Sequence, residues 1–370
     1  MTSDVIRSAE LRCRGERDKE SDFSHGAQSY ARRGGLCNSI HLAFIFDVDD
    51  GEVLAIVFLL AAKLFATEDL PVHENHLRLL IIGDAGATHS ALRAGMLRVH
   101  QQNPIDAILL VGDNFYPCGI SGLDDPQWTK ITQHFGQLQV PIYAILGNHD
   151  YGDPQEHNNE VITCGPTDPE AELEEGDRFP AWQFPARSYA LQSPLVDIIM
   201  IDTQPIASGF TQPFRGSATG AENIEFLRQQ LEKSIGTWRI VVGHHTIYSS
   251  GVHGRTKDSL RSNMRALLPL LQSRSNGADL YICGHDHDLE LIGDRDARVR
   301  PWFLISGAGS GLDVMRTRSA TEPATLFPGS LSPFLGFAVI DINLAVLTIT
   351  FYDRKGYVRG GPFTLVRRIR

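Results

Sequence analysis

The sequence predicts a soluble α/β protein, and three observations support this. The 370 residues are 42% hydrophobic and 21% charged, which is the composition of a globular chain. Short apolar runs recur from Leu77 onward, as strands buried on both faces require, with helical or loop segments between them. Five of these runs end in glycine and a polar residue, the pattern expected at the carboxyl ends of strands in an α/β sheet.

Composition also excludes several classes of protein. The net charge is −10 and no cluster of Lys or Arg is present, so the chain lacks the basic surface that nucleic acid binding requires. The five cysteines are too few and too scattered for a disulfide scaffold, and no CxxC pair indicates a zinc ribbon.

Residues 1–70 are expected to lie outside the folded domain. Residues 1–35 mix charges without apolar periodicity, which predicts disorder. The apolar segment at 53–66 begins with VLAIVFLLAA, a ten-residue run that is too short for a stable membrane span of about 20 residues. Two interpretations stay open: a helix added to the domain, or a signal sequence behind a mis-assigned upstream extension, with Ala62 or Ala66 at the cleavage site.

The polar residues that follow the five expected strands should lie together at the carboxyl ends of those strands. The strand runs are LRLLII before Gly83, DAILLV before Gly112, PIYAIL before Gly147, WRIVV before Gly243 and DLYIC before Gly284. Although a prior of about 150 residues per domain allows two domains, these blocks run through one sheet system, which predicts a single domain at 77–370.

The side chains after these strands suit metal ions. Carboxylate, amide, phenol and imidazole groups favour iron, manganese or zinc, and no set of thiolates favours softer metals. Their number exceeds what one ion requires, and a carboxylate can bridge two. Two ions about 3.5–4 Å apart suit the hydrolysis of phosphoesters. The candidate residues are Asp84, Asp113, Tyr116, Asn148, His149, His244, His285 and His287.

Five sequence blocks resemble those of a known family. GDAG (83–86), GDNFY (112–116), GNHD (147–150), VVGH (241–244) and GHDH (284–287) are similar, in order, to the motifs of the purple acid phosphatases, which are calcineurin-like metallophosphoesterases. Within this family, the sequence most resembles the tartrate-resistant (type 5) branch. The resemblance extends beyond the motifs to residues 182–191, 201–203 and 306–310. The resemblance implies two mixed β-sheets packed as a sandwich between helices, an α/β/β/α arrangement.

The resemblance also implies roles for individual residues. Asp84, Tyr116 and His287 match ligands of Fe(III), and Asp113 matches the bridging ligand. Asn148, His244 and His285 match ligands of a divalent ion, which is Fe(II), Zn or Mn in this family. His149 and His253 match catalytic histidines outside the ligand set, although Val252 stands where type 5 members often carry an acidic residue.

The implied function is hydrolysis of phosphate monoesters at acidic pH by a metal-bound hydroxide. Small molecules or phosphopeptides would be the substrates, and the enzyme would be a secreted or extracytoplasmic monomer, with a lysosome-like compartment as a further location. The alternatives are a phosphodiesterase or nucleotide pyrophosphatase on the same site, and a non-catalytic anchor that kept the fold. Filled ligand positions argue against the anchor.

One acidic segment is expected near the site mouth. Residues 152–180 contain nine Asp or Glu residues and one Arg, which would repel polyphosphates or favour basic phosphopeptides, unless the segment is a plain solvated insertion. Cys118 and Cys164 either pair across the mouth or stay as free thiols.

Overall fold

A computed structural model describes most of the chain from residue 65 onward and two short strands before it. The described residues are 7–10, 41–44, 65–70, 72, 75–86, 90–152, 155–157, 160–162, 164–254, 259–294, 299–312, 323–328 and 334–368. Residues 53–64 of the apolar segment lie outside them, so both interpretations of that segment stay untested. Among the described helices, none is long and apolar enough to cross a membrane.

The larger sheet has eight strands, ordered β16-β14-β15-β13-β12-β11-β10-β3. Its centre is parallel from β11 to β15, whereas β14 and β16 pair antiparallel at one edge and β10 pairs antiparallel with β11. The bounds are β3 Phe65–Asp69, β10 Ser188–Gln192, β11 Val196–Met200, β12 Trp238–Val242, β13 Leu280–Cys283, β14 Leu289–Ile292, β15 Trp302–Ser306 and β16 Thr325–Pro328.

The second sheet has seven strands, ordered β19-β18-β17-β4-β5-β6-β9. Strands β4, β5, β6 and β9 are parallel, and β17 to β19 add an antiparallel edge. The bounds are β4 His76–Ile82, β5 Ala107–Val111, β6 Ile142–Ile145, β9 Trp182–Gln183, β17 Gly336–Asn343, β18 Val346–Asp353 and β19 Val358–Val366. Both sheets are therefore mixed, as predicted.

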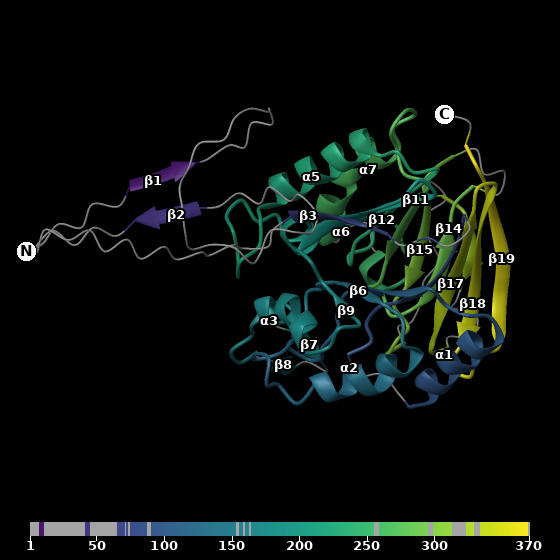
Figure 1. The fold of residues 1–370 in the computed structure, drawn as a ribbon, viewed down its shortest axis with the longest axis horizontal. Coiled ribbons are helices and arrows are strands. Elements are labelled where there is room, and N and C mark those ends of the chain that lie inside the picture. Colours follow the sequence, from purple (N-terminus) through teal and green to yellow (C-terminus); the bar gives the residue numbers. More distant parts are fainter. Residues whose placement is uncertain are drawn as a thin grey trace, which may run out of the picture.

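Helices cover the outer face of each sheet (Figure 1). α1 and α2 lie along the seven-stranded sheet, and α5, α6 and α7 lie along the eight-stranded one. The bounds are α1 Ser90–Gln102, α2 Trp128–Phe135, α3 Pro169–Glu174, α4 Gln204–Ala207, α5 Gly220–Lys233, α6 Ser259–Met264 and α7 Leu268–Leu271, with 3-10 turns at Gly136–Leu138, Glu175–Asp177, Val252–Gly254 and Arg265–Leu267. The predicted four-layer sandwich is confirmed.

Alternation along the strands explains why both faces are apolar. On β12, Ile240 joins the core between the two sheets, whereas its neighbour Val241 joins the core beneath the helices. On β13, Ile282 and Tyr281 divide in the same way. Successive strand residues point to opposite faces, so a strand between two apolar layers needs a continuous apolar run.

The domain begins earlier in the sequence than expected. β3 pairs in parallel with β10 at the edge of the eight-stranded sheet, so residues 65–69 belong to that sheet. The segment FATED contains two acidic residues and no apolar run, and its partner lies far along the chain, which is why its pattern did not indicate a strand.

Two small sheets are separate from the two large ones. β1 (Arg7–Glu10) pairs antiparallel with β2 (His41–Phe44), and β7 (Gln155–His157) pairs antiparallel with β8 (Glu160–Ile162). The expectation that all of residues 1–70 lie outside the domain is wrong for 65–69, and the expectation that they carry none of the chemistry stays a prediction.

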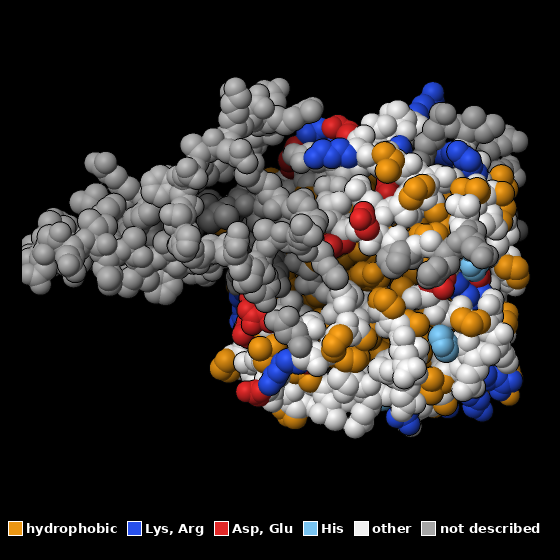
Figure 2. Space-filling view, in the orientation of Figure 1, with side chains coloured by type: hydrophobic (Ala, Val, Ile, Leu, Met, Phe, Trp, Pro, Cys, Tyr) orange, Lys and Arg blue, Asp and Glu red, His pale blue; other side chains and the backbone are white. Residues whose placement is uncertain are grey.

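Charged side chains are dispersed over the visible face of the molecule. In Figure 2, the Lys and Arg side chains of the described residues are interspersed with Asp and Glu, and they form no continuous basic surface on that face. The absence of nucleic acid partners remains an expectation from composition.

Candidate metal centre

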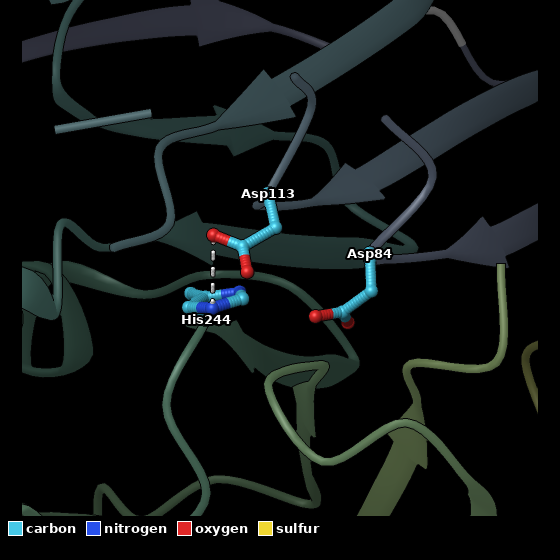
Figure 3. Close-up of side chains that lie close together, drawn as sticks. All are labelled: Asp84, Asp113 and His244. Carbon is cyan, nitrogen blue, oxygen red and sulfur yellow. Dashed lines mark ion pairs between the residues drawn. The ribbon is translucent and has the colours of Figure 1, made fainter. Parts of the chain in front are cut away.

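The predicted ligands lie at the carboxyl ends of strands from both sheets. β4, β5 and β6 lead to Asp84, Asp113 and Asn148, whereas β12 and β13 of the other sheet lead to His244 and His285. Figure 3 shows Asp84 and Asp113 entering from neighbouring turns, with His244 facing them. The backbone turns sharply at both carboxylates, with φ of 55° at Asp84 and 54° at Asp113, a region that few residues other than glycine adopt.

One group of donors surrounds the Tyr116 hydroxyl. The phenol oxygen lies 3.1 Å from Asp84 Oδ1, 3.0 Å from Asp113 Oδ2 and 3.0 Å from His287 Nε2. His287 Nε2 lies 3.4 Å from Asp84 Oδ1. Side chains from three loops, Asp84, Asp113 and His287, thus lie within hydrogen-bond distance of the phenol oxygen.

A second group of donors surrounds the Asn148 amide. Its Oδ1 lies 3.1 Å from His244 Nε2 and 3.1 Å from His285 Nδ1. Asp113 joins this group as well, because its Oδ1 lies 3.4 Å from His244 Nε2. Asp113 therefore contacts both groups, one through each carboxylate oxygen. The structure brings all seven predicted ligands together.

Glycines leave the space that these side chains fill. A Cβ on Gly147 would collide with the Asp113 carboxylate, and one on Gly284 would collide with Asp84 Oδ2. Gly112 has φ of 89°, and a Cβ there would lie 2.5 Å from His244 Nδ1. These three glycines are thus explained by close approach to a donor side chain, as well as by the turn.

The donor atoms of the group fit a metal ion, and their ionisation is mutually dependent. Burial raises the pKa of Asp84. Burial acts in the same direction on Asp113, but His244 and His149 outweigh it and hold the pKa of that carboxyl well below its usual range. Burial lowers the pKa of His244, whereas Asp113 raises it, with a net value of about 9. Ligand atoms of Asp84, Asp113 and His244 lie within 4.8 Å of one another, so these oxygen and nitrogen donors fit a metal ion.

The two predicted catalytic histidines border the ligand groups. His149 Nδ1 lies 2.5 Å from the carbonyl oxygen of Pro117, and its Nε2 lies 3.8 Å from Asp113 Oδ2. The centroid of the His253 ring lies 4.1 Å from that of His285, and its backbone N–H donates to Asp286 Oδ1 at 2.9 Å. Each imidazole is thus next to one of the two groups.

Asp150 ties two ligand loops together, a role that sequence reasoning missed. Its Oδ2 accepts hydrogen bonds from the backbone N–H of Gly147 at 2.8 Å and Asn114 at 3.1 Å, and its Oδ1 accepts one from Phe115 at 3.0 Å. Burial raises the pKa of Asp150 to about 7. Its place at the end of the GNHD block was the available signal.

Thr203 anchors the histidine loop, and its role was also missed. Its Oγ1 accepts hydrogen bonds from the backbone N–H of His244 and of His245, each at 3.1 Å. The same oxygen lies 2.9 Å from Nδ1 of the buried His245. Thr203 ends the IDT segment, so its inclusion in the resemblance was the only sequence signal.

Three carboxylates of the acidic segment have partners within the domain. Glu172 is fully buried and accepts a hydrogen bond from Asn114 Nδ2 at 3.0 Å. Glu170 pairs with the buried Arg187 at 2.8 Å, and Asp168 caps α3. These three carboxylates are engaged within the domain. The acidic site mouth stays a prediction, because other carboxylates of the segment, such as Asp153, lie outside the described residues.

A disulfide joins this segment to the ligand loop. Cys118 and Cys164 are bonded to each other. Thr167 Oγ1 donates to the carbonyl oxygen of Cys118 at 3.0 Å. Of the two possibilities left open by the sequence, the structure has the paired cysteines.

Comparison with known proteins places this geometry in a family. Residues 77–289 match the family described as calcineurin-like phosphoesterase. The chain is 34% identical to purple acid phosphatase 7 of Arabidopsis thaliana over 77% of this chain and 85% of that protein, and 32% identical to purple acid phosphatase 3 over 75% of each. It is 26% identical to human tartrate-resistant acid phosphatase type 5, over 76% and 88%.

A solved structure has the same fold. The structure described as GAP50, the anchor in the inner membrane complex of Plasmodium, matches with a TM-score of 0.59 and 24% identity over 80% of this chain and 90% of that one. At that identity the likeness concerns the fold alone. Together with the matches above, the sequence and the fold lead to one assignment: the chain belongs to the calcineurin-like phosphoesterases, within the purple acid phosphatase family.

Proposed function

We propose that this chain is an acid phosphatase that hydrolyses phosphate monoesters with two metal ions. The observation that carries the proposal is the position of Asp113, whose two oxygens contact two separate donor groups. A carboxylate so placed is suited to bridge two ions, and a pair of ions suits phosphoester hydrolysis. The matches to purple acid phosphatases support the same reaction.

The donor set divides into two sites. Asp84, Tyr116 and His287 would hold Fe(III), with Asp113 shared, because a phenolate oxygen is a hard donor suited to a trivalent ion. The other donors, Asn148, His244 and His285, would hold a divalent ion. When bound, the ions supply Lewis acidity, which neutralises phosphate charge and lowers the pKa of water.

The two histidines beside the ligands would bind the substrate phosphate and donate a proton to the leaving group. His149 is partly accessible, with 14% of its side chain exposed, and its Nε2 faces the Asp113 carboxylate, so it can bind a phosphate oxygen above the ligand groups. His253 packs on His285 and can donate a proton to the leaving oxygen. An imidazole donates a proton only in its charged form, which acidic solution favours.

The proposed location is an extracytoplasmic compartment. The Cys118–Cys164 bond supports it, because disulfides persist in oxidising compartments and are rare in the cytosol. Small-molecule or phosphopeptide monoesters are the proposed substrates.

One purified preparation tests the proposal against its alternatives. Metal analysis should find iron. The visible spectrum should contain a charge-transfer band that is lost in Tyr116→Phe. The protein should hydrolyse p-nitrophenyl phosphate faster than bis(p-nitrophenyl) phosphate. Absence of iron and of the band would overturn the ferric assignment. Preference for the diester would favour a phosphodiesterase, and a fully metallated chain inactive on both would favour an anchor.

A further inference from the structure

The loop between α4 and α5 lies beside the turn that carries His149. The ring of Tyr151 stacks on that of Phe214, with centroids 6.3 Å apart. A Cβ on Gly152 would lie 2.9 Å from Arg215 Nη1, and Gly152 N–H donates to the His149 carbonyl at 2.8 Å. The ends of such a turn lie within about 7 Å of each other, and the Arg215 guanidinium lies against Gly152, the residue that closes the turn beginning at His149.

The backbone of Arg215 is fixed in place. Its carbonyl oxygen accepts a hydrogen bond from Arg187 Nη2 at 2.9 Å. Arg187 is buried, and it also donates to Glu170 Oε2 at 2.8 Å and to the Tyr151 hydroxyl at 2.9 Å. Arg215 has φ of 46°, which is disfavoured for a residue with a side chain. A buried network therefore holds an arginine where glycine or asparagine would fit more readily.

The charge of Arg215 is not neutralised within the described part of the chain. The side chain is exposed, its guanidinium lies 5.4 Å from the centroid of the Phe214 ring, and no described carboxylate pairs with it. Neighbouring arginines differ in this respect, because Arg178 pairs with Asp124 and Arg187 with Glu170. Since Glu170 and Glu172 are engaged with Arg187 and Asn114, Arg215 is a cation without a carboxylate partner among the described residues beside the His149 turn.

From these observations we propose that Arg215 is a specificity residue that binds a second anionic group of the substrate. The favoured substrates would be phosphate monoesters or anhydrides whose leaving group carries its own phosphate. The planar guanidinium suits this role, because it offers paired N–H donors to phosphate oxygens. The inference rests on the proposed phosphatase function, since it assigns the scissile phosphate to the neighbouring ligand groups.

Kinetics with two substrates test the inference. Arg215→Gln should lower the ratio of kcat/KM for pyrophosphate to that for p-nitrophenyl phosphate roughly tenfold, and Arg215→Lys should lower it less. Arg98→Gln is the matched control, since Arg98 is an exposed arginine stacked on Tyr357 at 4.3 Å on α1, and it should leave the ratio unchanged. A ratio for Arg215→Gln within twofold of the wild-type value would overturn the inference.

A binding measurement separates this inference from the proposed function. Methylenediphosphonate resists hydrolysis, so calorimetry with the metal-loaded proteins reports binding without turnover. Its affinity should fall roughly tenfold in Arg215→Gln relative to wild type and Arg98→Gln, and equal affinities would refute the subsite. A wild-type protein that hydrolyses neither p-nitrophenyl phosphate nor pyrophosphate would contradict the phosphatase proposal, while the calorimetric comparison would still decide the role of Arg215.

Discussion

Replacing Arg187 with methionine tests whether the buried network beside the site stabilises the domain. Arg187 is 2% exposed and donates three hydrogen bonds, to the Tyr151 hydroxyl, to Glu170 and to the Arg215 carbonyl. Methionine fills a similar volume but leaves these acceptors without their donor. Breaking a buried charged network in this way typically costs about 3–5 kcal/mol.

For Arg187→Met, we expect a loss of unfolding free energy near the lower limit of this range, because of the surroundings of the groups that Arg187 contacts. Glu170 has 37% of its side chain exposed, so water can solvate its carboxylate once Arg187 is gone. The Tyr151 hydroxyl keeps its hydrogen bond to Asp202. We therefore expect a loss of about 3 kcal/mol in the free energy of unfolding and a decrease of roughly 6–12 °C in Tm.

Urea denaturation followed by tryptophan fluorescence measures this loss. Glu170→Gln is the control, and it should cost about 1 kcal/mol or less because its carboxylate is partly exposed. A loss below about 1 kcal/mol in Arg187→Met, or equal losses in the two variants, would refute the reasoning. Since Arg187 also fixes the Arg215 backbone, the pyrophosphate selectivity should fall in the same variant.

Three further predictions concern the centre and its surroundings. His149→Ala and His253→Ala should each lower turnover about 10²-fold or more while both metals are retained, and loss of metal in either variant would contradict a role outside the ligand set. Gly147→Ala should lower metal affinity at least tenfold, as measured by metal analysis after dialysis, because the new Cβ would collide with the Asp113 carboxylate. Burial raises the pKa of Asp202 from 3.8 to about 6, so the folded state holds this proton more tightly than the unfolded one. The stability should therefore rise by about 2 kcal/mol as the pH falls from 6 to 3.8. Asp202→Asn should remove that rise in urea titrations across this pH range, and an unchanged slope would disprove the assignment.

The central strands and the candidate ligands could be predicted because their signals are local. A run such as WRIVV before Gly243 records burial on both faces and a sharp turn, and β12 ends where that run ends. The edge strand β3 could not be found this way, since FATED forms a strand only by pairing with β10, more than a hundred residues away. The burial of Glu172 could not be predicted either, because it also depends on a partner that is distant in the sequence. Its partner Asn114 lies in another motif, and composition alone left open an acidic site mouth or a plain solvated insertion.

The origin of the ligands in two sheets has a consequence for assembly. Asp84, Asp113 and Asn148 follow strands of the seven-stranded sheet, whereas His244 and His285 follow strands of the other. Their mutual distances are fixed only once the apolar core between the sheets has formed, in which Leu80 and Leu109 of one sheet belong to the same cluster as Ile240 and Leu304 of the other. A local loop such as GNHD cannot hold an ion by itself, because Asn148 needs the imidazoles of the facing sheet. Metal binding should therefore be coupled to folding of the whole sandwich, so that bound metal raises the stability of the entire domain in one cooperative transition.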